Sequence, residues 1–229
     1  HISDAHNLVA EPVACGQFFG DELDLLVLNG DIPNHSGDVK NFNAICEIAS
    51  GITHGQIPCV FARGNHDTRG IHAEDMPDYI PIKDGKTYYT FRAGCVWGLL
   101  MDCGEDKLDS HAEYGNMVAC SFFREKQTRF LENLAENCEK KFVNEGIEHR
   151  IVFAHNPFTR RYLEPFNIEE EIYGEWTRLI GDNIEPDLFF FGHTHTYGVY
   201  KVGGAFDYYG QSCPAVIGSE PRSKEDSFI

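Results

Sequence analysis

The chain contains five short and almost uniformly apolar runs, which constrain its fold more than any other feature. They occupy residues 23–28, 58–62, 96–101, 150–154 and 187–191. A short run without polar alternation is typical of a strand buried on both faces, as in a largely parallel sheet. Such strands need a layer of other elements on each side. The runs therefore predict a layered α/β protein.

Helical patterns lie between these runs. Three helices are predicted, over residues 39–49, 130–142 and 171–180. Gly51 ends the first, and Ser121 is a candidate N-cap ahead of the second. Residues 88–97 predict an antiparallel hairpin that turns at Ala93 and Gly94. Alternation of strands and helices again indicates an α/β fold.

Composition narrows the class of protein. Of 229 residues, 42% are hydrophobic, enough for a substantial core. The formal net charge is -17, so a nucleic-acid partner is not expected, because binding to nucleic acid needs basic surface. A phosphate ester is not excluded, because bound divalent ions would reverse the local charge. No apolar run approaches the ~20 residues that span a membrane.

The eight cysteines form no CxxC pair. Several lie in apolar runs or patterns, as do Cys59, Cys95 and Cys138. A disulfide framework is more typical of smaller secreted chains. We therefore predict buried, reduced thiols.

The ends of the chain suggest a longer natural polypeptide. Only three residues precede Asp4, fewer than a parallel strand needs, and residues 219–229 are polar. We expect residues 1–229 to form a single domain that is truncated at both ends. The given residues contain no signal peptide, but this carries little weight because the chain opens directly on the first motif. We expect a cytoplasmic location.

Five polar segments lie at the ends of apolar stretches. They are Asp4-Ala5-His6, Gly30-Asp31, Gly64-Asn65-His66-Asp67, Ala154-His155 and Gly192-His193-Thr194-His195. Carboxylates and imidazoles together suit divalent Mn, Fe, Zn or Co. Two such ions about 3.5–4 Å apart can bind both the attacking and the leaving oxygen of a phosphoryl transfer. The segments therefore predict a dinuclear metal site.

These segments differ in how strongly each one indicates a metal site. By itself, Asp4-Ala5-His6 is typical of a surface turn, and His155 of a buried histidine with an internal hydrogen bond. The segments that begin at Gly64 and Gly192 indicate a metal site more strongly. Polar residues directly after a buried strand lower stability unless they serve in a binding or catalytic site. His193 and His195 alternate along an extended backbone, so both can face one site.

The order of the segments resembles the calcineurin-like metallophosphoesterase family over residues 4–195. The resemblance implies a four-layer αββα sandwich, with two mixed β-sheets flanked by helices and a dinuclear site at the C-terminal strand ends. Within the family, the motifs resemble the cyclic-nucleotide phosphodiesterase-like branch. They differ from purple acid phosphatases, which carry a glycine in place of His6 and a metal-binding tyrosine in place of Asn34.

The resemblance also implies a role for each residue of the motifs. The ligands of the first ion would be Asp4, His6 and His195, those of the second Asn65, His155 and His193, and Asp31 would bridge both ions. A hydroxide bridging the two metals would attack phosphorus. His66 would donate a proton or a hydrogen bond to the leaving oxygen, and Asp67 would orient the His66 ring from behind.

The substrate is less constrained. Candidates for binding its anion are Arg63, Arg69, Arg160, Arg161 and His35, although solvated loop charges are the alternative for the arginines. Residues 103–120 and 158–173 follow strand ends and are expected to form the pocket walls.

The expected function is metal-dependent hydrolysis of a small phosphate ester, either a monoester or a diester. The alternative is a catalytically silent binding module that keeps the fold. Silent relatives lose metal ligands or the proton donor, whereas this chain keeps all of them.

Overall fold

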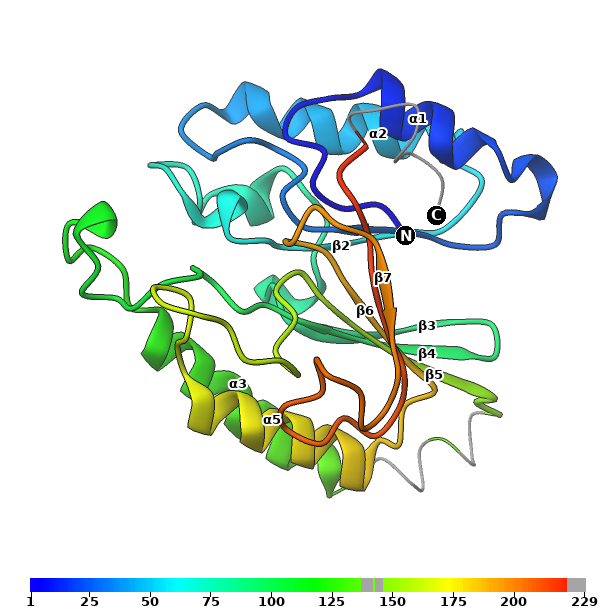
Figure 1. Cartoon of the computed structure of the whole chain (residues 1–229). Coiled ribbons are helices and arrows are strands. Elements are labelled where there is room, and N and C mark those ends of the chain that lie inside the picture. The colour runs from blue at the N-terminus through cyan, green and yellow to red at the C-terminus, as the bar shows by residue number, and fades with distance from the viewer. Residues whose placement is uncertain (137–141, 143–145, 222–229) are drawn as a thin grey trace.

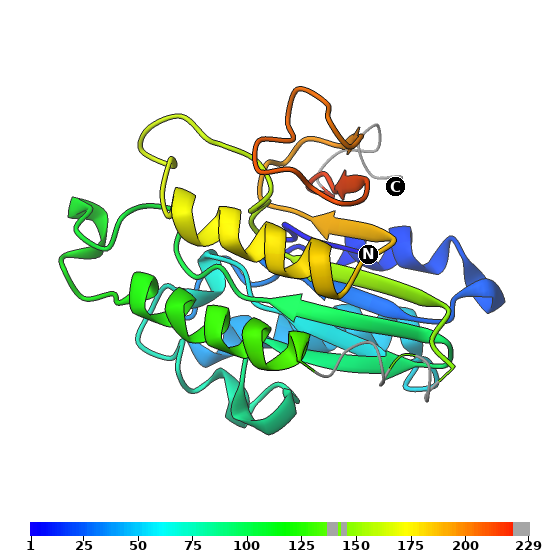
Figure 2. The same cartoon turned by 90° about the horizontal axis from the view of Figure 1, so that it is seen from below.

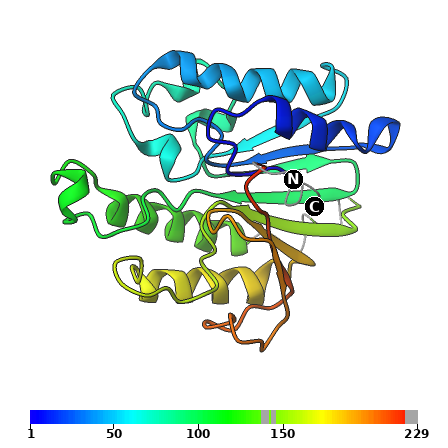
Figure 3. The same cartoon turned by 45° about the horizontal axis from the view of Figure 1, so that its top comes forward.

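The computed structural model describes residues 1–136, 142 and 146–221. Two sheets lie face to face between two pairs of helices (Figures 1 and 3). The smaller sheet pairs β1 (Leu26–Asn29) with β2 (Cys59–Ala62) in parallel, and Ile2 adds an isolated parallel bridge to Leu28. The predicted arrangement of two sheets flanked by helices is confirmed, with only parallel pairs in the described part of the smaller sheet.

The larger sheet is mixed and has the order β3-β4-β5-β6-β8-β7. Its strands are β3 (Tyr89–Ala93), β4 (Val96–Met101), β5 (His149–Ala154), β6 (Leu188–Phe191), β7 (Gly198–Tyr200) and β8 (Ala215–Ile217). Strands β4, β5, β6 and β8 run parallel, and β3 and β7 pair antiparallel at the two edges. The carboxyl ends of the parallel strands therefore meet along one edge of the sheet.

Helices cover the outer face of each sheet (Figure 2). The smaller sheet is covered by α1 (Ala10–Gln17) and α2 (Asn43–Thr53), and the larger by α3 (Cys120–Ala135) and α5 (Glu170–Asn183). Short 3-10 turns occur at Gly20–Glu22, Val39–Phe42, His66–Thr68, Met76–Asp78, Lys83–Gly85 and Ala112–Tyr114.

Alternate strand residues contribute to different cores, which explains the uniformly apolar runs. Leu99 and Met101 of β4 pack beneath α3 and α5, in a cluster that contains Trp176. Between them, Leu100 points into the core that separates the two sheets, where it packs with Val27 of β1. Because both faces of these strands are buried, no polar alternation is left in the sequence.

Most predicted elements are present. The hairpin is formed by β3 and β4, with Ala93 opposite Val96, and the predicted helices correspond to α2, α3 and α5. The predicted cap of α3 is wrong, because Ser121 lies inside the helix. The carboxylate of Asp109 instead accepts hydrogen bonds from the backbone N–H groups of Cys120 and Ser121, at 3.0 and 3.1 Å. Residues 137–141 of the predicted helix lie outside the described residues.

The sequence did not predict α1, β7 or β8. Helix α1 has eight residues and contains Pro12 and Gly16, both poor helix formers. Gly16 is required by packing, because a Cβ at this position would collide with Ile52 of α2. Strands β7 and β8 have three residues each, too few to show a period.

The cysteines differ in part from the prediction. Three free thiols are buried, namely those of Cys103, Cys120 and Cys213. Three others are exposed, namely those of Cys46, Cys59 and Cys95. Burial was wrong for the exposed group, whose members lie on α2, at the first residue of β2 and in the β3–β4 turn. Cys138 lies outside the described residues. None of the helices in the described part of the chain is long and apolar enough to cross a bilayer.

The cap of α3 can be tested by substitution. Asp109→Ala should lower the free energy of unfolding by about 1 kcal/mol, because two N–H groups of the first turn lose their acceptor. Urea unfolding would measure the change. Ser121→Ala is the matched control and should change stability by a few tenths of a kcal/mol at most. Equal losses in the two variants would contradict the assignment of the cap.

Candidate metal centre

The five polar segments meet where the carboxyl ends of strands from both sheets converge. Asp31 and Asn65 follow β1 and β2 of the smaller sheet. His155 and His193 follow β5 and β6 of the larger sheet. Asp4 follows the N-terminal bridge to β1. Parallel alignment of these strands thus places residues that are distant in the sequence at one edge.

Their potential ligand atoms form three overlapping groups. Within each group the atoms lie within 4.8 Å of one another, and the groups are Asp4, His6 and His195; His6, Asp31 and His66; and Asp31, His155 and His193. Asp31 and His6 each belong to two groups, so the groups form one continuous cluster. Such a cluster is large enough for two ions.

The backbone of the cluster is strained. Five of the expected ligands have a positive φ, namely Asp4 (57°), His6 (46°), Asp31 (53°), His193 (72°) and His195 (55°). A residue with a Cβ is disfavoured in this left-handed region by roughly 1–2 kcal/mol. Strain of this kind gathers at functional sites, where the surrounding structure maintains it. Its concentration here makes the cluster the candidate functional site.

His155 lies between two carboxylates and is fully buried. Its Nδ1 donates a hydrogen bond to the carbonyl oxygen of Asn29 at 2.8 Å, which leaves Nε2 to face the site. Nε2 lies 3.1 Å from Asp31 Oδ2 and 3.6 Å from Asp4 Oδ1, so it faces both carboxylates. An imidazole nitrogen and two carboxylates directed at one another are a set of groups that can hold a cation, either a proton or a metal ion.

Electrostatics show how strongly this set attracts positive charge. Burial lowers the pKa of His155, but the carboxylates of Asp31 and Asp4 outweigh burial and raise it to about 10. Burial also opposes ionisation of the two carboxyl groups, but the charge of His155 prevails and lowers the pKa of both. A proton on His155 thus supplies the charge that a metal ion would supply. The residues present fit a divalent cation.

The other imidazoles also face the cluster. His195 Nε2 lies 3.3 Å from Asp4 Oδ1 and 3.3 Å from His6 Nε2. His193 Nδ1 lies 2.9 Å from Asn65 Oδ1. Burial lowers the pKa of His6, and burial together with the charge of His155 lowers that of His193 to about 4. Neutral imidazole is the form that binds a metal.

His66 lies beside the cluster, but its expected partner is different. We expected Asp67 to orient its ring. Instead, the Asp67 carboxylate accepts hydrogen bonds from the backbone N–H groups of Asp31 and Gly64, at 2.8 and 2.6 Å. His66 Nδ1 donates to the carbonyl oxygen of Asn34 at 2.9 Å. The predicted orienting role of Asp67 is therefore wrong. Its carboxylate fixes the loops after β1 and β2 instead.

Sequence reasoning missed two residues that orient expected ligands. Asn29 ends β1, holds His155 through its carbonyl oxygen, and donates from its side chain to Ala154 in the other sheet at 3.1 Å. The sequence feature that could have identified Asn29 is a lone polar residue at the end of an apolar run. Glu220 Oε2 lies 2.9 Å from His195 Nδ1. No pattern in the sequence connects Glu220 with the site, because only folding brings it near.

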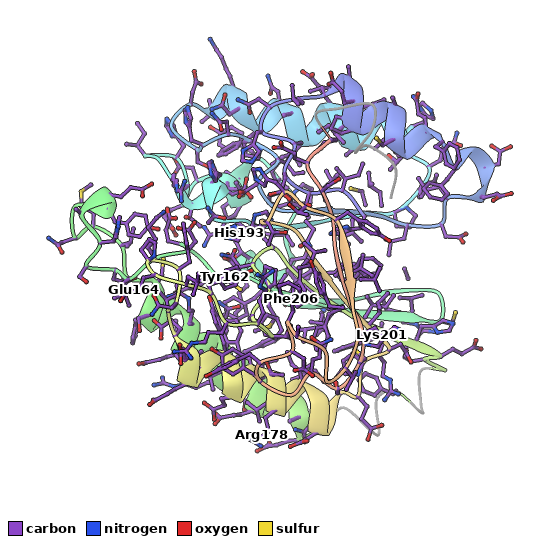
Figure 4. The ribbon with its side chains drawn as sticks, viewed as in Figure 1. Tyr162, Glu164, Arg178, His193, Lys201 and Phe206 are labelled. Atoms are coloured by element: carbon purple, nitrogen blue, oxygen red, sulfur yellow. The ribbon has the colours of Figure 1, made fainter. Side chains whose placement is uncertain are left out.

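A cavity of about 580 Å³ opens over the cluster. Asp31, His66 and His193 form its floor, and Arg160, Tyr162 and Phe206 belong to its wall. Figure 4 labels three of these residues, His193, Tyr162 and Phe206, which lie near one another in the middle of the molecule. Segment 158–173 was expected to line the pocket and does so, whereas Phe206 comes from the unpredicted loop between β7 and β8.

Three substrate candidates lie elsewhere. Arg63 is buried and paired with Asp102 at 2.7 Å, Arg161 is exposed and paired with Glu170 at 2.8 Å, and exposed His35 accepts from the N–H of Gly37 at 3.0 Å. None of the three lines this cavity, so their role in binding the substrate gains no support from it and stays a prediction. Their structural partners could not be identified from the sequence.

Arg69 has a different relation to the site. Its guanidinium is held by Glu105, with Nη2 at 2.9 Å from Oε2, and its Nη1 lies 3.1 Å from His66 Nε2. Because arginine only donates, His66 Nε2 is the acceptor in this contact. Arg69 therefore reaches the site through His66, while Arg160 is the candidate arginine that lines the cavity.

Solved structures share this fold. A dimetal phosphatase from Danio rerio has a TM-score of 0.59 at 13% identity, with 96% of this chain and 86% of that chain covered. GAP50, the anchor in the inner membrane complex of Plasmodium, has a TM-score of 0.58 at 12% identity, with 96% and 70% covered. Purple acid phosphatase PPD1 from yellow lupin (Lupinus luteus) has a TM-score of 0.53 at 13% identity, with 90% and 38% covered. At these identities the likeness concerns the fold alone.

The family follows from the sequence match. No curated protein matches the chain. The model of the calcineurin-like phosphoesterase family matches residues 1–197, which contain all five polar segments. The family is one of metal-dependent phosphoesterases, and the ligand groups found here agree with a site for divalent ions. The chain belongs to the calcineurin-like phosphoesterase family.

Proposed function

We propose that this chain hydrolyses a phosphate ester with the help of two divalent metal ions. The observation that carries the proposal is the buried Nε2 of His155, which faces the carboxylates of Asp31 and Asp4 within one group of potential ligand atoms. The first ion would be held by Asp4, His6 and His195, the second by Asn65, His155 and His193, with Asp31 shared. When bound, the ions supply Lewis acidity and lower the pKa of water.

His66 would act on the leaving oxygen through Nε2. Its Nδ1 is committed to the carbonyl oxygen of Asn34, so the ring is oriented and Nε2 is the position left for chemistry. Nε2 now accepts from Arg69. A proton on Nε2 would end this contact and free Arg69 Nη1 for an oxygen of the substrate. The pair would thus move a proton and a hydrogen-bond donor together.

The finer assignments are proposals from the donor set and the family. Carboxylate and imidazole ligands favour Mn, Fe or Zn. Both phosphomonoesters and phosphodiesters fit the proposed chemistry. The cyclic-nucleotide phosphodiesterase-like branch, the cytoplasmic location and the single domain stay predictions, as does the absence of a nucleic-acid partner.

A catalytically silent module is the competing function. GAP50, which shares the fold, is described as an anchor. The expected ligands and His66 are all present in this chain and close together, which favours the enzyme. Hydrolysis of an aryl phosphate monoester and diester with Mn²⁺, with and without a chelator, distinguishes the two. Bound metal without turnover of either ester would favour the silent module.

Removal of the shared carboxylate should reduce metal content. Asp31→Asn leaves one neutral oxygen where both ligand groups now share a buried charge, so we expect at least one ion per chain to be lost. Metal analysis after dialysis measures the loss. Asp182→Asn is the matched control at an exposed surface pair and should retain both ions. Two retained ions with full activity in Asp31→Asn would contradict the shared role.

Loss of His66 should reduce turnover and leave the metals in place. His66→Ala removes the proposed acid, and we expect kcat to fall about 10²- to 10⁴-fold. The same preparation should contain as much metal as the unsubstituted protein. His35→Ala is the control, because His35 is an exposed histidine outside the cavity. An unchanged kcat in His66→Ala would contradict the proposed role of His66 as the acid that acts on the leaving oxygen.

A further inference from the structure

Arg160 lines the cavity, yet the described residues provide no ion pair for it. Its neighbour Arg161 is bound to Glu170 at 2.8 Å, and buried Arg124 lies 3.2 Å from Glu169. In a chain with a net charge of -17, an arginine that faces a cavity without an acidic partner is unexpected. Arg160 Nε is also buried and lacks a hydrogen-bond partner. These features indicate a cationic group whose partner is a ligand.

Two aromatic rings hold the guanidinium of Arg160. Its Cζ lies 4.6 Å from the ring centroid of Tyr162 and 4.6 Å from that of Phe206. Tyr200 packs against Phe206 with its ring centroid at 4.6 Å, which supports the wall from behind. Rings that cover a guanidinium exclude water there and leave its in-plane N–H groups as donors. This arrangement suits two parallel hydrogen bonds to an oxyanion.

Tyr162 connects this arginine with the proposed metal centre. Its ring centroid lies 6.2 Å from that of His193, and both residues line the same cavity as Arg160. Figure 4 shows Tyr162 and His193 next to each other, with Phe206 nearby. With a volume of about 580 Å³, the cavity accepts a small organic molecule. One ligand can therefore contact both the cluster and Arg160.

The acidic residue of the wall does not neutralise Arg160. Asp106 Oδ1 lies 2.9 Å from Lys107 Nζ and accepts from the Tyr114 hydroxyl at 2.8 Å. Arg69 Nη2 adds a third contact at 3.4 Å. Asp106 is thus already satisfied by its own neighbours. The positive charge of Arg160 remains available to the cavity.

We propose that the substrate carries a second oxyanion on its organic group, and that Arg160 binds this oxyanion while the ester phosphoryl group lies at the metal cluster. The inference rests on the phosphoesterase function proposed above. A carboxylate and a phosphoryl group share the required chemistry, namely two oxygens that accept from a guanidinium fork. The substrate class is therefore a small phosphate ester with an additional carboxylate or phosphoryl group.

The test compares probes that differ only at the far end. Phenyl phosphate has no second anion, 4-carboxyphenyl phosphate has a carboxylate, and 4-phosphonophenyl phosphate has a phosphonate that cannot be hydrolysed. We expect kcat/KM for at least one charged probe to exceed that for phenyl phosphate. The preference is measured as the ratio of kcat/KM for a charged probe to kcat/KM for phenyl phosphate. In Arg160→Met this ratio should fall about 10- to 100-fold, the usual effect of losing a charged hydrogen-bond partner. Comparing this ratio in the unsubstituted protein and in Arg160→Met cancels the intrinsic reactivity of each probe. The probe whose ratio falls more identifies whether Arg160 prefers a carboxylate or a phosphoryl group.

Controls separate binding from folding. Arg161→Met is the matched variant, because it removes a neighbouring arginine outside the cavity, and the ratio should not change. Arg160→Lys keeps the charge without the fork and should retain part of the preference. If Arg160→Met does not fold by circular dichroism, Arg160→Lys carries the comparison. The proposal is overturned if the ratio is near one in the unsubstituted protein, or is the same in the Arg160 variants.

A binding measurement distinguishes failure of this inference from failure of the proposed function. Calorimetric titration with phenylphosphonate and 4-carboxyphenylphosphonate requires no turnover. If no probe is hydrolysed but the carboxylated phosphonate binds more tightly, and Arg160→Met loses the difference, the phosphoesterase function fails and the Arg160 anion site stands. If the probes are hydrolysed without preference and both phosphonates bind equally, the function stands and the anion site fails.

Discussion

Buried negative charge is the constraint on which this molecule depends. Asp4, Asp31 and Asp67 lie together at the junction of two sheets with almost no exposure to solvent. Burial and the charge of Asp31 raise the pKa of Asp67 well above its usual value, so this carboxyl group is disfavoured as an anion. The charge of His155, which stands between the other two, is the largest influence that lowers their pKa against the effect of burial. Carboxylates so placed require protons or metal cations, and the surrounding histidines suit both.

The scaffold concentrates this charge because its strands are parallel. In a parallel arrangement the carboxyl ends of neighbouring strands meet at one edge, so each strand can contribute a loop residue to one place. Two sheets packed face to face double the number of such loops. The Asp67 carboxylate then joins the loops after β1 and β2, and the side chain of Asn29 joins the smaller sheet to the larger. These hydrogen bonds maintain the left-handed backbone that the cluster requires.

The arginines show why sequence reasoning stops short of the substrate. Arg160 and Arg161 are adjacent and chemically identical, yet one lies between two aromatic rings in the cavity and the other lies on the surface beside Glu170. Neighbouring residues in a loop point in different directions, and a loop has no period that would indicate which faces inward. Phe206 illustrates the same limit, because it reaches the cavity from a loop that no pattern predicted. Asp109 illustrates this limit for the fold, because its carboxylate accepts from the first N–H group of α3 although it lies eleven residues before the helix.

By itself, the sequence determined the layered α/β class, the main strands, and the five segments that carry the chemistry. It could do so because burial on both faces removes polar residues from a strand, and because polar residues at a strand end stand out against that background. Only the tertiary structure decided which arginine faces the cavity, that Asn34 rather than Asp67 orients His66, and that Glu220 supports His195. These contacts join residues through loops, where the path of the chain is set by packing in three dimensions and leaves no periodic trace in the sequence.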